Sequence, residues 1–192
     1  MQAHALEGGF SDAPVQAARA FRCAMRAMAC PGTIETLDTA RPPAPLSSAA
    51  GTLLLTLCDP ETGVHLAGGH DRPEVRDWVA FHTGAPVVSA GAARFAIGTW
   101  GQLLPLSQYA AGTPEYPDRS ATLIVEMQEL SKDGTVLTGP GINGRATLSL
   151  PDAGEMRANA RCFPLGLDFF LTCGGRVAAL PRSTKPGGAP CT

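Results

Sequence analysis

Hydrophobic residues near the N-terminus recur at the spacing of one helical face. Ser11 or Asp12 can cap the start of a helix there, and Pro14 suits its first turn. Pro31-Gly32 marks its end. The pattern predicts an amphipathic helix with an apolar stripe of Ala18, Phe21, Met25 and Met28 and a polar side of Arg19, Arg22 and Arg26.

Longer apolar runs predict the strands. Residues 52–58 lie between Gly51 and Asp59-Pro60 as a nearly continuous apolar run, which favours a strand buried on both faces. Residues 121–127 predict a second central strand. Gly174-Gly175 separates two more runs, 167–173 and 176–180, as a hairpin turn would. Shorter strands are expected at 87–88, 95–97, 136–138 and 146–150.

Further helices are expected between these strands. Asp71 can cap a helix that starts near Pro73 and ends at Gly84, with Glu74 placed as in a capping box. Its expected inner face is Val75, Trp78, Val79 and His82. Residues 152–162 also predict a helix, whereas Pro105 weakens a helix over 102–109. Strands that alternate with helices predict an α/β fold with some antiparallel pairing. The chain is expected to form one domain over 1–192, with flexible ends at 1–9 and 184–192.

Composition narrows the function classes. The net charge of −2 argues against a generic nucleic-acid binder, which needs a basic surface. No stretch of 18 apolar residues is present, and the N-terminus lacks the features of a signal peptide. The six cysteines form no Cys-x-x-Cys pair. We therefore expect no membrane span and a cytoplasmic location.

Residues 139–144, Gly-Pro-Gly-Ile-Asn-Gly, match the spacing of a dinucleotide-binding loop. That loop requires a following helix, whereas residues 145–150 read as a strand, so NAD binding is excluded. Two interpretations stay open. The loop could bind an anion through its backbone, or it could be a tight connection that needs glycine dihedral angles. The candidate ligand-binding residues are Gly139, Gly141, Asn143, Gly144 and Arg145.

Two side chains elsewhere are further candidates. His82 falls at a helix end, where it could serve as an acid or base or could simply interact with the helix terminus. Arg182 follows the last strand and would lie on the usual ligand side if that strand joins the main sheet. The loop 112–119, rich in proline and charge, precedes a strand and is explained equally well as an ordered turn.

The sequence gives little support for a bound cofactor or a metal site. Pyridoxal phosphate requires a lysine for its Schiff base. Lys132 lies in a turn-like segment and Lys185 near the C-terminus, so neither resembles a buried amine. The histidines and cysteines have no metal-ligand spacing, so no metal site is expected.

A series of short motifs runs in order along nearly the whole chain, from about Gly8 to Thr184. Each is weakly specific, and together they resemble the H subunit (PhnH) family of the bacterial carbon–phosphorus lyase system. The motifs are Gly8-Gly9-Phe10, Pro31-Gly32-Thr33-Ile34, Leu57 to Thr62, Phe81 to Pro86, Tyr116-Pro117-Asp118, Ser120 to Leu123, Thr138 to Ile142, Phe163 to Asp168 and Ala179 to Thr184. Cys30 and Cys173-Gly174-Gly175 depart from that family's pattern, and Cys30 removes support for an anion-binding role at that position.

The resemblance implies a three-layer α/β fold, a mixed sheet with flanking helices similar to pyridoxal phosphate-dependent transferases but without the cofactor. It implies a homodimer that joins the G, I and J subunits of a larger complex. In that family the complex supports attack of a phosphonate oxygen on the ribose C1′ of ATP. Adenine leaves, and the product is a ribose 1-phosphonate 5-triphosphate.

The leading hypothesis is therefore a subunit needed by alpha-D-ribose 1-methylphosphonate 5-triphosphate synthase. Its role would be largely structural, without a complete active site or assigned catalytic residues of its own. The alternative is a free-standing phosphate- or phosphonate-binding protein or small-molecule enzyme. It would use the glycine loop, Arg145, His82 and Arg182.

Overall fold

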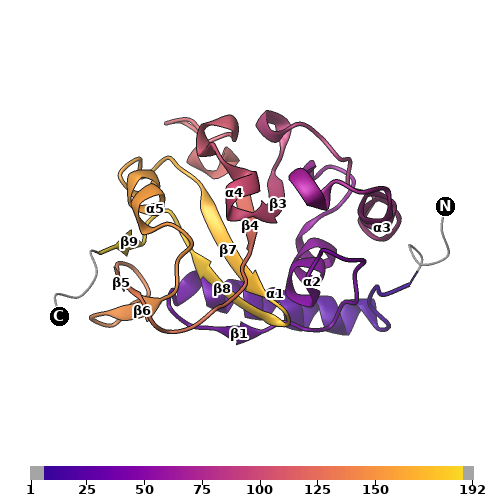
Figure 1. Ribbon diagram of the computed structural model, residues 1–192, viewed down its shortest axis with the longest axis horizontal. Coiled ribbons are helices and arrows are strands. Elements are labelled where there is room, and N and C mark those ends of the chain that lie inside the picture. The colour runs from indigo at the N-terminus through magenta and orange to yellow at the C-terminus, as the bar shows by residue number, and fades with distance from the viewer. Residues whose placement is uncertain (1–6, 188–192) are drawn as a thin grey trace.

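A six-stranded mixed sheet forms the centre of the computed structural model, which describes residues 7–187 (Figure 1). Its strand order is β1-β8-β7-β4-β3-β2, in which β2, β3, β4 and β7 run parallel and β7, β8 and β1 pair antiparallel. A second, three-stranded sheet has the order β6-β5-β9. The strands are β1 (Glu35–Thr36), β2 (Val64–Leu66), β3 (Phe95–Thr99), β4 (Thr122–Glu126), β5 (Thr135–Thr138), β6 (Ala146–Leu148), β7 (Asp168–Cys173), β8 (Arg176–Leu180) and β9 (Lys185–Pro186).

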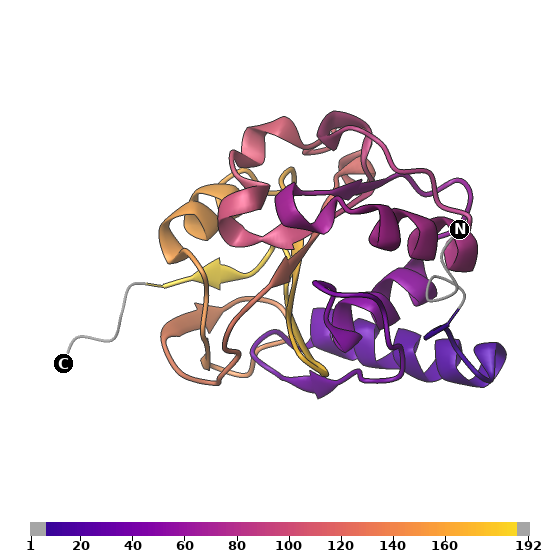
Figure 2. The same ribbon diagram turned by 45° about the vertical axis from the view of Figure 1, so that its right-hand side comes forward.

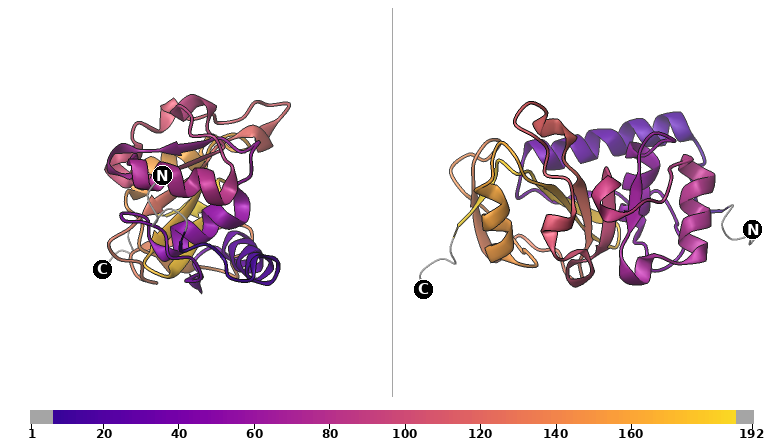
Figure 3. Two further views of the ribbon diagram at one scale, coloured as in Figure 1. Left: turned by 90° about the vertical axis from the view of Figure 1, so that its right-hand side faces the viewer. Right: turned by 90° about the horizontal axis from the view of Figure 1, so that it is seen from above.

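Helices cover both faces of the main sheet, as Figures 2 and 3 show. Ile124 and Phe170 face the core beneath α1, α2 and α3, while Leu123 and Phe169 face the other core, with α4 and α5. This alternation is the period of two expected for strands. The α-helices are α1 (Ala13–Ala29), α2 (Ser48–Leu57), α3 (Pro73–Thr83), α4 (Trp100–Leu103) and α5 (Ala153–Ala160). Short 3-10 helices are η2 (Gly68–His70), η3 (Ala90–Ala92), η4 (Leu106–Gln108) and η5 (Pro117–Arg119). The predicted mixed α/β fold is confirmed.

The strand predicted over residues 52–58 is wrong, because this segment belongs to helix α2. The Ser47 side chain caps the helix by accepting a hydrogen bond from the Ala50 backbone N–H at 3.1 Å. Residues 49–54 are all buried. A helix enclosed on nearly every side has no polar face, so its sequence reads as a continuous apolar run, as a central strand does.

Of the stripe predicted to be the apolar face of α1, only Met28 packs against the core. Phe21 and Met25 are 49% and 53% exposed, whereas Ala20, Ala24 and Ala27 are buried. Small side chains let α1 lie close to α2 and β8, since the distance between packed helices depends on the side chains at the contact. Large apolar residues are therefore left on the solvent side.

Most other elements follow the sequence prediction. The hairpin of β7 and β8, the central strand β4 and the helix α5 are confirmed. Helix α3 ends at Gly84, whose φ of 70° is left-handed, but Asp71 pairs with Arg76 instead of capping the helix. The segment 102–109 is divided between α4 and η4, and 87–88 makes only a single bridge, from Val87 to Val64.

The described residues at both ends of the chain are tied to the fold by hydrogen bonds. The Trp78 indole and the Arg41 backbone N–H donate hydrogen bonds to the Glu7 and Gly8 carbonyls. At the other end, Lys185–Pro186 forms β9 and pairs with β5. The described parts of the two ends expected to be flexible, 7–9 and 184–187, thus make contacts with the fold, and the rest of both segments lies outside the described residues.

Candidate functional site at the amino edge of the sheet

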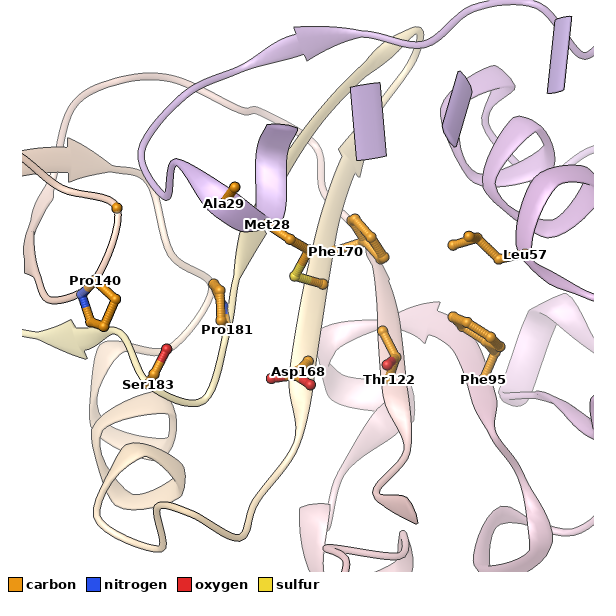
Figure 4. Close-up of a pocket in the computed structure, with 11 residues that line it drawn as sticks. Met28, Ala29, Leu57, Phe95, Thr122, Pro140, Asp168, Phe170, Pro181 and Ser183 are labelled. Atoms are coloured by element: carbon orange, nitrogen blue, oxygen red, sulfur yellow. The ribbon is translucent and has the colours of Figure 1, made fainter. Parts of the chain in front are cut away.

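A pocket of about 470 Å³ lies at the amino ends of three parallel strands (Figure 4). Phe95, Thr122 and Asp168 are the first residues of β3, β4 and β7 and lie side by side in register. The remaining wall comes from α1, α2, the middle of β7, the glycine loop and the segment after β8; its residues are Met28, Ala29, Leu57, Pro140, Gly141, Phe170, Pro181 and Ser183. The pocket therefore occupies the edge opposite to the one where parallel sheets usually bind ligands.

The walls of this pocket suit an apolar group better than a phosphate. Helices α1 and α2 both end here, at Ala29 and Leu57, and helix carboxyl ends carry partial negative charge. The Asp168 carboxylate adds a full negative charge, which Arg182 neutralises. A bound anion would meet no cationic side chain among the residues that line the pocket.

Arg182 is fully engaged in holding the chain together at this edge. Its guanidinium pairs with the Asp168 carboxylate and donates to the Pro117 carbonyl at 2.6 Å and to the Ser120 hydroxyl. The side chains of Arg182 and Asp168 are 13% and 21% exposed. Because β8 runs antiparallel to β7, Arg182 lies at the amino edge, so the expected position on the usual ligand side is wrong.

The glycine loop packs its backbone against neighbouring chain segments. Gly139, Gly141 and Gly144 have φ values of 134°, 78° and 77°, which side-chain-bearing residues rarely adopt. A Cβ on Gly141 would lie 1.8 Å from the Ala29 carbonyl oxygen. The residues after the loop form β6, so the predicted strand is confirmed. This geometry supports a tight connection that requires glycine.

The polar end of the same loop does not line the pocket. Asn143, Gly144 and Arg145 are exposed. Among the described residues, Arg145 has no hydrogen-bond or ion-pair partner. Anion binding by the loop and Arg145 stays a prediction.

His82 lies at the other end of the molecule. Its ring contacts the rings of Trp78 and Phe81, with centroids 5.0 and 4.9 Å apart, and its Nε2 is 3.3 Å from the Glu7 carbonyl oxygen. Helix α3 and the β5-β6 hairpin lie at opposite ends in Figures 1 and 3. The predicted ligand residues therefore do not form one cluster: Gly139, Gly141 and Arg182 lie at the amino edge, and His82 lies apart.

Residues of the pocket that sequence reasoning missed include Thr122, Asp168 and Ser183. Each lies inside a short motif noted above, but none of those motifs shows which strand ends will meet. The loop 112–119 serves mainly as an ordered turn, since a Cβ on Gly112 would lie 2.7 Å from the Pro117 carbonyl oxygen, which in turn accepts from Arg182.

The lysines and the possible metal ligands within residues 7–187 bear on cofactor and metal binding. Lys132 and Lys185 are both exposed. Within this range, no three His, Cys, Asp or Glu side chains lie close enough together to hold a metal ion. Of the helices in the described part of the chain, none is both long and apolar enough to cross a membrane.

The comparisons with known proteins agree with the ordered motifs of the sequence. Residues 8–186 match the model of the family described as bacterial phosphonate metabolism protein (PhnH), so the chain belongs to that family, as the motifs predicted. The chain is 41% identical over 193 residues to the "Alpha-D-ribose 1-methylphosphonate 5-triphosphate synthase subunit PhnH" of Rhizobium meliloti (strain 1021), covering 96% of both chains. It is 28% identical over 194 residues to the "Putative C-P lyase subunit protein HtxG" of Stutzerimonas stutzeri, covering 93% of this chain and 94% of the relative.

Replacing glycines of the loop separates steric clash from dihedral strain. Gly141→Ala should lower the free energy of unfolding by about 3 kcal/mol or more, because the new Cβ collides with the Ala29 carbonyl. Gly144→Ala should cost only about 1–2 kcal/mol, since its φ is similar but nothing lies within 4 Å of the new Cβ. Urea unfolding measures both, and equal losses would contradict this packing.

Removing Arg182 tests its role at the amino edge. Arg182→Ala should lower the free energy of unfolding by about 2 kcal/mol, because it leaves the Asp168 carboxylate without its guanidinium partner and the Pro117 carbonyl without its side-chain donor. Arg119→Ala, which removes an arginine stacked 3.9 Å over the Tyr116 ring, should cost about 1 kcal/mol or less. Combining Arg182→Ala with Asp168→Ala should cost less than the sum of the single changes, and additive losses would rule out the coupling.

Proposed function

We propose that this chain is a subunit of the carbon–phosphorus lyase core complex of organic phosphonate catabolism. With partner subunits it would be needed for transfer of ribose triphosphate from ATP to methylphosphonate, as alpha-D-ribose 1-methylphosphonate 5-triphosphate synthase. One observation carries the proposal: the 41% identity to a protein named as a subunit of that synthase, over 96% of both chains.

We propose a largely structural role within that assembly. In support, the ionisable groups at the amino-edge pocket, Asp168 and Arg182, bind each other and the neighbouring backbone. The pocket wall is otherwise made mainly of apolar groups and backbone. Such an arrangement holds strands together and offers a surface, whereas acid–base catalysis needs a side chain that is free to exchange a proton with substrate.

The partners proposed are a second copy of the chain and the G, I and J subunits. The exposed face of α1 supports a heterologous contact, because Val15, Phe21 and Met25 are 44%, 49% and 53% exposed and lie on one helix. The same helix carries Arg19, Arg22 and Arg26 and no acidic residue, and within residues 7–187 only Arg26 of the three has an ion-pair partner, Glu35. Pairing this face with its own copy would bring like charges together, so we assign it to a different subunit with acidic groups around an apolar centre.

Two finer features belong to the same proposal. The fold would be comparable to that of pyridoxal phosphate-dependent transferases without the cofactor, in line with the exposed positions of both lysines. The location would be cytoplasmic, in line with free thiols at Cys23, Cys30, Cys58, Cys162 and Cys173.

Co-expression with the G, I and J subunits tests assembly and the α1 face together. The unmodified chain should co-elute with them as one assembly in size-exclusion chromatography. Changing Phe21 and Met25 to Ser should weaken co-elution at least about tenfold in apparent affinity, since burying each side chain is worth about 1.5–3 kcal/mol. Phe81→Ser removes an equally exposed ring from α3 and should leave the assembly intact.

Two results would contradict the proposal. A chain that elutes alone, ignores the other subunits and gains thermal stability with ATP or a phosphonate would be a free-standing binder or enzyme. Loss of co-elution by Phe81→Ser but not by the α1 variant would move the contact from α1 to α3.

A further inference from the structure

We propose that a second, basic pocket, between α5 and β9, binds a compact polyphosphate anion. This pocket has a volume of about 270 Å³ and is lined by Arg157, Ala160, Arg161, Lys185 and Pro186. Three of these five residues are cationic and none is acidic. The chain as a whole carries a net charge of −2, so this concentration of positive charge is local.

The three cations come from two elements that hold them in place. Arg157 and Arg161 are four residues apart at the end of α5, which puts them on one face of the helix. Lys185 comes from β9, which pairs with β5 and lies beside α5 (Figure 1). The Arg157 guanidinium donates to the Gly187 carbonyl at 3.0 Å, so the helix is tied to the segment after the strand. The pocket is therefore largely formed before any ligand arrives.

Helix electrostatics explain only part of this cluster. Arginines in the last turn of α5 complement the partial negative charge of its carboxyl end. That explanation does not extend to Lys185, which belongs to a different element. Within residues 7–187, none of the three cations forms an ion pair, unlike Arg26, Arg76 and Arg182. An anion entering the pocket would gain attraction from all three and relieve their mutual repulsion.

The size and lining of the pocket define the class of ligand. Its volume lies just below the range of about 300–1,000 Å³ that is typical of pockets for drug-sized molecules. No aromatic ring lines it, so nothing there can stack on a nucleobase. Guanidinium groups bind phosphate oxygens in pairs, and the lysine ammonium adds a point charge. The ligand is therefore a phosphate chain, free or as the exposed end of a larger molecule.

The inference is independent of the proposed function and of the glycine loop. The pocket lies on the α5 side of the sheet, while α1 packs on the opposite face. Substitutions at one place should leave the other intact. Failure of anion binding and failure of subunit assembly can therefore be told apart.

Isothermal titration calorimetry with inorganic tripolyphosphate at low ionic strength tests the site on the isolated chain. Arg161→Ala and Lys185→Ala should each raise the Kd about tenfold, the loss expected for one charge-assisted contact. Both side chains are exposed, so the variants should keep the melting temperature of the unmodified chain. Lys132→Ala removes the other lysine, in an exposed turn, and should change the Kd by less than about twofold. ATP and GTP should bind with equal affinity, because the base stays outside the pocket. Added salt should weaken the binding of tripolyphosphate, ATP and GTP alike.

Several results would overturn this inference. The first is an unmodified chain that binds no tripolyphosphate. The second is equal weakening by Lys132→Ala, which would mark a general charge effect. The third is loss of binding in Arg145→Ala but not in Lys185→Ala, which would place the anion at the glycine loop. If Arg161→Ala and Lys185→Ala instead abolish co-elution with partner subunits and leave tripolyphosphate binding unchanged, the cations form a subunit contact.

Discussion

The bidentate pair of Arg182 and Asp168 is the constraint on which the two sheets jointly depend. Asp168 begins β7, the strand that joins the parallel part of the main sheet to its antiparallel part. Arg182 follows β8 and also binds the Pro117 carbonyl and the Ser120 hydroxyl, just before β4. Beyond Arg182 the chain lies against Gly139 at Ser183–Thr184 and continues into β9. One guanidinium thus fixes the ends of adjacent strands and the path from the six-stranded sheet to the three-stranded one.

The distribution of charge makes three regions of the surface suited to different ligands. At the amino edge Asp168 and Arg182 neutralise each other, and two helix carboxyl ends add negative potential. The pocket at this edge is therefore poorly suited to phosphate. On the α5 side, three cations converge without acidic partners. On the α1 side, apolar side chains and arginines share one exposed helix. Cavity size alone would favour the first region, but charge balance favours the second for an anion and the third for a protein partner.

The sequence predicted the elements whose pattern allows one interpretation and failed where two patterns coincide. β4 and the β7-β8 hairpin were predicted because apolar runs are bounded by turn residues. Helix α2 was missed because burial on nearly all sides removes the polar period. In α1 two sets of residues have the same helical spacing. The buried set is Ala20, Ala24 and Ala27, and the second set, Phe21, Met25 and Met28, follows it by one residue. Periodicity cannot choose between two such stripes, and the close approach of α1 to its neighbours decides in favour of alanine.

The candidate sites could also be predicted only in part, because they combine residues from elements that are distant in the sequence. The sequence singled out Arg182, but its partner Asp168 lies across a hairpin, and only the antiparallel register brings the two together. Arg157 and Arg161 are visible as neighbours on a helix, whereas Lys185 joins them only because a two-residue strand containing Pro186 pairs with β5. Proline cannot donate a ladder hydrogen bond, so such a segment resembles a loose tail in sequence. The ordered motifs could therefore identify the family although they contain no set of catalytic residues. The surfaces proposed for a ligand or a partner could not be predicted, because they depend on contacts between elements that are distant in the sequence.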